Sequence, residues 1–213
     1  MTNPCTGVVL AGGRNTRFNG KDKALIHIGQ RQVLDRILEI FSDLFDDIIL
    51  VTNEPVKYLT WDVTLATDIY PVRSSLTGIH AGLFFTANPY AFFTACDMPF
   101  LKKEIVKTII GGIEPGVDVI IPETTAGLEP LCAVYSKNCQ KSAEHNLRQP
   151  HLKIQQFFKT VRVKKIEEKE LRKKDPELIS FYNINTPTDL DRAERIEAAE
   201  SGVNGLPNAY GNY

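Results

Sequence analysis

The stretch Gly7–Leu25, GVVLAGGRNTRFNGKDKAL, holds the features that decide the fold of this chain. Its apolar run, Val8-Val9-Leu10, is typical of a fully buried strand. The chain then breaks abruptly into Ala11-Gly12-Gly13. Two adjacent glycines directly after a buried strand let the backbone adopt crowded conformations and let a ligand approach bare N–H groups. The stretch therefore predicts a strand that ends in a ligand-binding turn.

Positive charge follows the glycines closely. Four cations lie within ten residues of one another: Arg14, Arg17, Lys21 and Lys23. A polyphosphate needs directional N–H donors for its oxygens and fixed positive charge to balance its own, and this stretch offers both. A tight turn with a solvated basic face is the alternative interpretation.

Two familiar phosphate-binding motifs do not match. A P-loop needs Gly five positions before Gly20-Lys21 and Ser or Thr after the lysine, but Asn15 and Asp22 occupy those places. The dinucleotide fingerprint GxGxxG also fails, because Gly12 and Gly13 are adjacent.

Buried strands and amphipathic helices alternate along the rest of the chain. We expect helices at 33–44, 75–87, 105–110, 136–147, 152–158 and from Thr186 to about 199, and further strands at 47–51, 63–66, 91–94, 118–122, 130–135, 161–166 and 179–183. The charged segment 164–174 is expected to form a solvated helix or loop. This order predicts an α/β fold of three layers, Rossmann-like, with a mostly parallel twisted sheet. We expect one domain at 1–200, made of two halves at about 1–122 and about 123–200, and a disordered tail at 201–213.

The composition is that of an ordinary globular protein. The 213 residues are 43% hydrophobic and 24% charged, with a formal net charge of −1. This balance gives no general attraction to nucleic acid or to anionic membranes, and no apolar run approaches the roughly 20 residues that span a bilayer. The four cysteines have no CxxC spacing, which favours reduced thiols and a cytoplasmic protein.

Asp97 is the best candidate outside the first loop. It follows the apolar run 91–94, at the expected carboxyl edge of a parallel sheet, where ligands bind in open α/β folds. A carboxylate at this edge suits Mg²⁺, which takes one or two carboxylates and substrate phosphate oxygens. The alternative is an aspartate that merely ends a strand.

These residues carry a resemblance to a known family. Leu-Ala-Gly-Gly at 10–13, Arg17-Phe18 and Asp-Lys-Ala-Leu at 22–25 resemble the signature of nucleotidyltransferases with a GT-A-like fold, and most of all the MobA-like molybdenum cofactor guanylyltransferases. The sequence at 96–99 resembles the CDxP segment of that family, and the sequence at 183–187 resembles its NxNTP segment.

The resemblance implies transfer of GMP from GTP to the terminal phosphate of molybdopterin, with release of pyrophosphate and formation of molybdopterin guanine dinucleotide. It implies catalytic roles for Arg17, Lys23 and Asp97, with Mg²⁺ held by Asp97. It implies molybdopterin binding by Asn183 and Asn185. The implied GTP-binding residues are Leu10, Ala11, Gly12, Gly13, Lys23, Asn53, Asp68 and Asp97. The resemblance also allows transient contact with other proteins of molybdenum cofactor biosynthesis or with acceptor enzymes.

Several of these residues also have ordinary structural interpretations. Asn53 and Asp68 follow expected strands, where turn residues are common. Asn183 and Asn185 are spaced by two on the last expected strand, so their amides would point the same way. Asn185 and Thr186 can instead serve only to cap the final helix, because the sequence Thr-Pro-Thr-Asp is a complete capping pattern.

The chain departs from the family pattern at two points. Asn19 stands directly after Arg17-Phe18, where the family usually has Gly, and Ser74-Ser75 replaces a usual Gly-Pro. Asn tolerates left-handed conformations better than most residues, so the first turn can survive.

Two other functions stay open at this point. One is a cytidylyl or sugar-phosphate nucleotidyltransferase that uses the same site, although Gly12 in LAGG, where many such relatives have LAAG, favours GTP. The other is a nucleotide-binding regulator without turnover, which the presence of Arg17, Lys23 and Asp97 disfavours.

Overall fold

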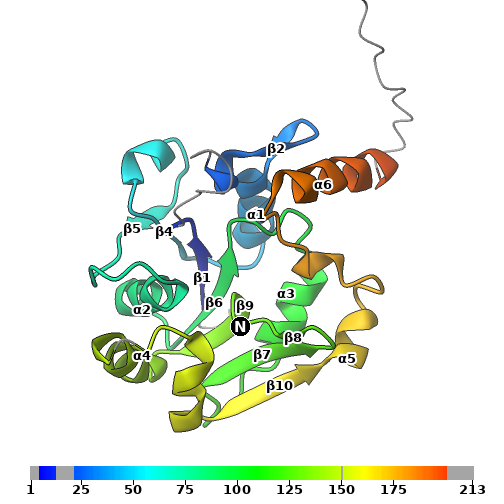
Figure 1. Ribbon diagram of the computed structural model, residues 1–213. Coiled ribbons are helices and arrows are strands. Elements are labelled where there is room, and N and C mark those ends of the chain that lie inside the picture. The colour runs from blue at the N-terminus through cyan, green and yellow to red at the C-terminus, as the bar shows by residue number, and fades with distance from the viewer. Residues whose placement is uncertain (1–4, 13–21, 150, 201–213) are drawn as a thin grey trace, which may run out of the picture.

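A central twisted sheet organises the chain, as a computed structural model of residues 5–12, 22–149 and 151–200 shows (Figure 1). Its strand order is β10-β7-β9-β6-β1-β4-β5, and β8 pairs with β7 beside this path. The strands are β1 (Cys5–Leu10), β4 (Ile48–Val51), β5 (Thr64–Ala66), β6 (Tyr90–Ala95), β7 (Val119–Thr124), β8 (Gly127–Leu128), β9 (Cys132–Ser136) and β10 (Val163–Glu167).

The sheet is mostly parallel, as the sequence predicts. β1 lies parallel to both β4 and β6, β4 lies parallel to β5, and β10 lies parallel to β7. The exceptions are β9, which is antiparallel to β6 and β7, and the short β8. The carboxyl ends of β1, β4, β5 and β6 therefore meet at one edge, together with the amino end of β9.

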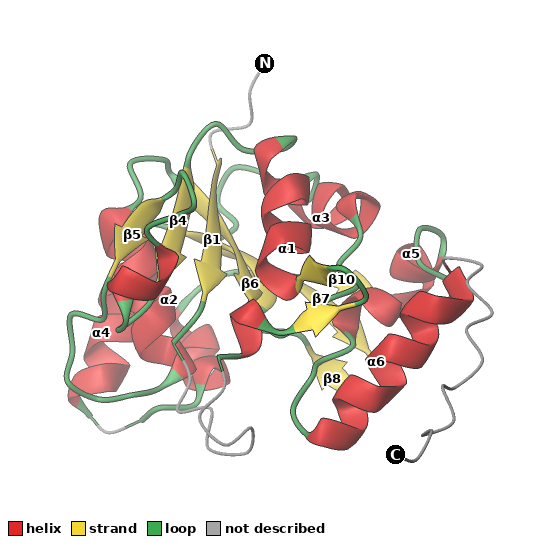
Figure 2. Cartoon of the chain, turned by 90° about the horizontal axis from the view of Figure 1, so that it is seen from above, coloured by secondary structure: helices red, strands yellow, loops and turns green. Residues whose placement is uncertain are grey.

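Helices cover both faces of this sheet (Figure 2). They are α1 (Val33–Ser42), α2 (Ser75–Phe85), α3 (Lys103–Ile110), α4 (Cys139–Arg148), α5 (Glu168–Arg172) and α6 (Pro187–Glu200), with 3₁₀ helices η2 (Lys23–Leu25), η3 (Pro55–Tyr58), η4 (Ile154–Thr160) and η5 (Ile179–Phe181).

Alternate strand residues belong to two separate cores, because successive side chains of a strand point to opposite faces. Val9, Leu50 and Phe92 pack with α1 and α3 in one core. Their neighbours Val8 and Phe93 pack with α2 and α4 in the other. This alternation produces the three layers that the sequence predicts.

The predicted last strand at 179–183 is wrong. The chain forms η5 there, and its backbone groups bond locally rather than to a neighbouring strand. Leu178 adopts a left-handed conformation with φ +53°. The buried Asp175 carboxylate accepts a hydrogen bond from Ser180 N at 2.8 Å and one from Lys102 Nζ at 2.8 Å. These contacts hold a compact turn, so the apolar pattern of this segment reflects burial and not a sheet.

The predicted strand at 161–166 is confirmed as β10, so the overlapping prediction of a solvated helix or loop at 164–174 is wrong for its first part. Residues 164–167 belong to the edge strand β10, and α5 follows directly. The lysines of this strand pair with carboxylates on neighbouring segments, Lys164 with Glu114 and Lys165 with Glu123. Charged side chains are common on an edge strand because they discourage pairing with another chain. The predicted helix at 152–158 is a 3₁₀ helix, η4, at 154–160.

A small hairpin that the sequence analysis missed joins the first loop to α1. Its strands are β2 (His27–Ile28) and β3 (Arg31–Gln32), with Gly29 at φ +61° between them. Arg36 on α1 donates hydrogen bonds to both oxygens of the Glu197 carboxylate, at 2.6 and 2.9 Å, and to the Ile28 carbonyl at 2.7 Å. This bidentate contact fixes α6 against the hairpin, outside the main layers.

Close packing of α2 on the sheet generates a stability prediction. A Cβ added at Gly82 would lie 2.6 Å from Phe93 Cε1 and 2.9 Å from Val8 Cγ1, and both side chains are fully buried. We expect Gly82→Val to lower the free energy of unfolding by about 2–3 kcal/mol, since overpacking typically costs about 1–3 kcal/mol. Urea unfolding followed by circular dichroism measures this change.

The matched control is Gly12→Ala, whose added Cβ would meet, among the described residues, only Asn53 Nδ2, at 3.9 Å. Its free energy of unfolding should stay close to that of the unchanged protein. Equal stability of the Gly82→Val variant would contradict the close approach of α2.

Candidate active site

Leu10, Ala11 and Gly12, the described candidate residues of the first loop, lie at the carboxyl edge of the sheet. Leu10 ends β1, and its carbonyl accepts a hydrogen bond from Cys96 N at 3.1 Å. Ala11 N donates to Val51 O at 2.9 Å, so the chain leaves the sheet between β6 and β4. Gly12 is exposed just beyond this point. The predicted residues Gly13 and Arg17 lie outside the described residues.

Local hydrogen bonds fix the turn that carries Lys23. Asp22 caps η2 by accepting a hydrogen bond from Ala24 N at 3.2 Å. The second oxygen of its carboxylate accepts a hydrogen bond from the Tyr58 hydroxyl at 2.7 Å, and Lys57 Nζ lies 4.0 Å away. Asp22 therefore orders the backbone that presents Lys23. The sequence analysis quoted Asp22 within a motif, but it had no signal for Tyr58.

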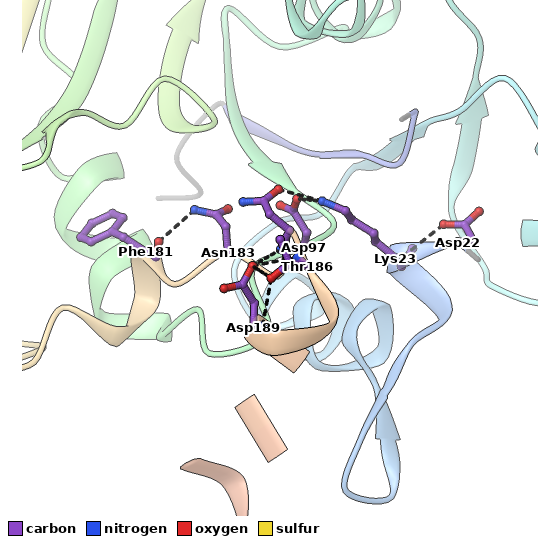
Figure 3. Close-up of polar contacts among 9 residues, drawn as sticks. Asp22, Lys23, Asp97, Phe181, Asn183, Thr186 and Asp189 are labelled. Carbon is purple, nitrogen blue, oxygen red and sulfur yellow. Dashed lines mark hydrogen bonds and ion pairs between the residues drawn. The ribbon is translucent and has the colours of Figure 1, made fainter. Parts of the chain in front are cut away.

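Lys23 connects the first loop to two distant segments (Figure 3). Its Nζ lies 2.9 Å from Asp97 Oδ2 and donates a hydrogen bond to Asn185 Oδ1 at 2.9 Å. The side chains of Lys23 and Asp97 are only 16% and 17% exposed, so solvent screens their attraction less than at an open surface. Three of the predicted site residues thus meet at one ammonium group.

Asp97 is tied to the last segment by the backbone as well. It follows β6 directly, and its carbonyl accepts a hydrogen bond from Ile184 N at 2.9 Å. Asn185 is therefore held beside Asp97 by the residue that precedes it.

A second aspartate shapes the Asn185 turn. One oxygen of the Asp189 carboxylate accepts hydrogen bonds from Asn185 N at 2.9 Å, from Thr186 N at 2.8 Å and from the Thr186 hydroxyl at 2.9 Å. Thr186 Oγ1 accepts a hydrogen bond from Asp189 N at 3.2 Å in return. The predicted capping pattern is present, and the same contacts orient Asn185 toward Lys23. The same hydrogen bonds therefore both cap α6 and position Asn185 in the site.

Asn183 does not join this cluster. Its amide donates a hydrogen bond to the Phe181 carbonyl at 2.9 Å, which is a local contact. The two amides were expected to point the same way because a strand was expected, and the observed turn removes the basis of that expectation.

Asn53 and Asp68 form a separate pair at the same sheet edge. They follow β4 and β5, and Asn53 Nδ2 donates a hydrogen bond to Asp68 Oδ2 at 2.7 Å. Burial raises the pKa of Asp68, and the Asn53 hydrogen bond and the charge of Arg73 oppose this shift only in part. An amide and a carboxylate together present both donors and acceptors, as a base or a ribose requires.

Asp97 is the residue of this site that suits a metal ion. Among the described residues, His, Cys, Asp and Glu side chains form no group of three or more that could hold a metal. Mg²⁺ is bound in proteins by one or two carboxylates together with substrate phosphate oxygens, so a single carboxylate at the carboxyl edge of the sheet fits this ion. The cysteines do not suit a metal site, because all four are free and buried, and burial raises the pKa of Cys5 and Cys139 to about 12.

Within the described part of the chain, no helix has the length and apolar character needed to cross a membrane.

Comparison with known proteins identifies the family of this chain. A sequence model of the MobA-like NTP transferase domain matches residues 7–165. The molybdenum cofactor guanylyltransferase of Desulfosudis oleivorans is 48% identical over 189 residues, which cover 89% of this chain and 94% of that protein. A probable molybdenum cofactor guanylyltransferase of Natranaerobius thermophilus is 36% identical over 200 residues, covering 92% and 97%.

A solved structure agrees with these relatives. The crystal structure of molybdopterin-guanine dinucleotide biosynthesis protein A from Archaeoglobus fulgidus superimposes with a TM-score of 0.81 at 31% identity, and the match covers 91% of this chain and 99% of that one. Nucleotidyltransferases of this kind typically use a divalent metal ion. The matched domain, the relatives and the shared fold together show that the chain belongs to the MobA-like NTP transferase family of nucleotidyltransferases.

Proposed function

We propose that this chain transfers GMP from GTP to the terminal phosphate of molybdopterin, releasing pyrophosphate and forming molybdopterin guanine dinucleotide. The observation that carries the proposal is the contact of Lys23 Nζ with both Asp97 and Asn185, each at 2.9 Å. This contact brings the cationic first loop, the carboxylate after β6 and the segment before α6 to one point. A reaction between two phosphorylated substrates needs such a meeting point, where charge is balanced and two ligands lie side by side.

The two substrates would approach from opposite sides of Asp97. Gly12 and Gly13 would seat the nucleotide through backbone N–H groups, and Leu10 and Ala11, at the end of β1, would lie against it. Asn53 and Asp68 would contact its base or ribose from the ends of β4 and β5. The nucleotide-binding half would comprise about 1–122. The acceptor-binding half, about 123–200, would contact molybdopterin through Asn183 and Asn185.

The reaction requires little acid–base chemistry from the protein. An oxygen of the terminal phosphate of molybdopterin forms a bond to the α-phosphorus of GTP, and the bond from that phosphorus to the β-phosphate bridging oxygen breaks. A phosphate nucleophile is already ionised near neutral pH, so no strong general base is needed. The work of the protein is alignment and neutralisation of charge.

Lys23 and Arg17 would supply the charge that the triphosphate and the departing pyrophosphate need. The ammonium group of Lys23 is already fixed by Asp97 and Asn185, so little reorganisation accompanies the reaction. Asp97 would hold Mg²⁺, which supplies positive charge to phosphate oxygens when bound.

The nucleotide can be identified by pyrophosphate release. We expect purified protein with Mg²⁺ and molybdopterin to release pyrophosphate with GTP, and to do so far more slowly with CTP, ATP or UTP. A preference for CTP would agree with the proposed nucleotidyl transfer but would show that GTP is not the nucleotide. No release with any of the four, from protein shown to be folded, would contradict the proposed function and favour a sugar-phosphate acceptor or a binding role.

The role of Asp97 can be tested with an isosteric change. Asp97→Asn keeps an oxygen that can accept the Lys23 hydrogen bond but removes the negative charge that a metal ion needs. We expect turnover to fall by about 10²–10³-fold, the usual effect of losing one electrostatic contact to a reacting phosphate or oxyanion, with an unchanged circular dichroism spectrum.

Asp43→Asn is the matched control, because Asp43 pairs with Lys103 at the surface, away from this site. Its turnover should equal that of the unchanged protein. Full activity of Asp97→Asn would show that the metal assignment is wrong.

Gly12 offers a test of nucleotide approach. Within the described part of the chain the position has room for a Cβ, with Asn53 Nδ2 the nearest atom at 3.9 Å, so we expect Gly12→Ala to fold normally. We expect its Kd for GTP to rise about tenfold, since one misplaced methyl group in a binding site costs about 1–3 kcal/mol. Isothermal titration with GTP measures this change, and an unaltered Kd would place the nucleotide away from Gly12.

A further inference from the structure

A second carboxylate lies at the same edge of the sheet as Asp97. The last ladder pair between β6 and β9 joins Thr94 to Cys132, and the two strands are antiparallel. Asp97 is three residues after Thr94, and Glu129 is three residues before Cys132. Beyond the ladder, Ala95 N still donates a hydrogen bond to Leu131 O at 3.1 Å. Asp97 and Glu129 therefore stand at the same end of two neighbouring strands.

The backbone around Glu129 is fixed. Its N–H donates a hydrogen bond to the Pro122 carbonyl at 3.1 Å, and its carbonyl accepts one from Cys132 N at 3.0 Å. The residue is bound on one side to the end of β7 and on the other to the start of β9. It is thus a rigid position, like Asp97, and not the tip of a loop.

The carboxylate of Glu129 differs from the other acidic groups around it. It is partly buried, and burial raises its pKa. It makes no hydrogen bond or ion pair with any residue that the structure describes, whereas Glu123 on the neighbouring β7 pairs with Lys165 at 2.7 Å and Asp97 pairs with Lys23. Glu129 is not among the described residues that have a fully buried polar atom without a partner, so its oxygens remain accessible to a ligand that supplies N–H groups.

The chemistry of a lone carboxylate narrows the class of ligand. Among the described residues, Glu129 belongs to no group of three or more potential ligand side chains, so nothing there indicates a metal ion held by the protein alone. A carboxylate pairs best with two parallel N–H donors, as in its bidentate contact with a guanidinium group. A 2-amino-4-oxopyrimidine ring presents the same pattern, with a ring N–H beside an exocyclic amino group. Both substrates of the proposed reaction contain this ring, as guanine in GTP and as the pterin of the acceptor.

The order of the strands favours the pterin over the guanine as the ring that Glu129 binds. The strands β1, β4 and β5 lie on one side of β6, and they lead to Gly12, Asn53 and Asp68. Glu129 lies on the other side of β6, between β9 and β7. A nucleotide on the first three strands would leave the β9 side to the acceptor.

We propose that Glu129 determines acceptor specificity by accepting hydrogen bonds from the ring N–H and the 2-amino group of the pterin. This inference rests on the proposed function for the identity of the acceptor. Glu129 would contact the pterin ring of the acceptor. Asn185, in contrast, lies beside the Lys23 and Asp97 pair, where phosphate groups are expected.

Replacement of Glu129 by glutamine tests the proposal. Glu129→Gln keeps the shape of the side chain but replaces one acceptor oxygen with a donor, which would oppose one of the two N–H groups. We expect KM for molybdopterin to rise roughly tenfold to a hundredfold, in line with the loss of a bidentate contact to a base edge. The Kd for GTP and kcat should stay within about twofold of the unchanged protein, because Lys23 and Asp97 are untouched.

Glu123→Gln is the matched control, since it makes the same chemical change on the neighbouring strand at a residue paired with Lys165. Its KM for molybdopterin should not change. An unchanged KM in Glu129→Gln would overturn the proposal. If the Glu129→Gln variant does not fold, Glu129→Asp keeps the charge, withdraws the carboxylate by one methylene and should also raise KM.

A second experiment tests whether Glu129 binds the pterin or the guanine. Inosine triphosphate lacks the 2-amino group, so a residue that reads guanine makes GTP bind more tightly than inosine triphosphate. Loss of this discrimination in Glu129→Gln, with an unchanged KM for molybdopterin, would assign Glu129 to the nucleotide and overturn the acceptor assignment.

Direct binding separates failure of this proposal from failure of the proposed function. Fluorescence titration with free pterin needs no turnover, and the unchanged protein should bind this probe more tightly than Glu129→Gln. Protein that binds pterin through Glu129 but releases no pyrophosphate from GTP would refute guanylyl transfer alone. Equal pterin binding by both proteins would refute the role of Glu129 whether or not the protein turns over GTP.

Discussion

The ion pair between Lys23 and Asp97 is the interaction on which the site depends. The two side chains are mostly buried, so each charge has lost much of its hydration, and removing either one would leave the other inadequately paired. The Asn185 oxygen supplies a further acceptor for the ammonium group at 2.9 Å. Residues separated by 74 and 162 positions in the sequence thereby become neighbours. The sheet edge, the first loop and the segment before α6 must all be in place for this contact to form.

Much of this arrangement follows from local sequence patterns. The apolar runs form the largely buried strands β1, β4 and β6, and the alternation of strands and helices leads to the three layers that were predicted. Residues that follow parallel strands gather at the carboxyl edge of the sheet, so Asp97, Asn53 and Asp68 were each expected there. The pairing of Asn53 with Asp68 at 2.7 Å was not foreseen, because it depends on the lateral order of β4 and β5.

The segment from 175 to 189 shows where prediction from sequence failed, and why. Its apolar residues indicated a strand, but two aspartates determine its path. Asp175 binds Ser180 N and Lys102, and Asp189 binds the backbone N–H groups of Asn185 and Thr186. A carboxylate that captures backbone donors competes with a β-ladder for the same groups. Periodicity cannot report this competition, because Lys102 comes from a distant part of the sequence.

The same segment shows how one set of contacts serves both folding and chemistry. Asp189 and Thr186 satisfy free N–H groups at the start of α6, which is ordinary helix capping. Since Asp189 also binds Asn185 N, the direction of the Asn185 side chain is fixed by the cap. At its other end, α6 is fixed by the bidentate contact between Glu197 and Arg36. A helix held at both ends is a rigid support, and a rigid support keeps the Asn185 oxygen within hydrogen-bonding distance of Lys23. The position of the outer helix α6 is therefore part of what preorganises charge at the carboxyl edge of the sheet.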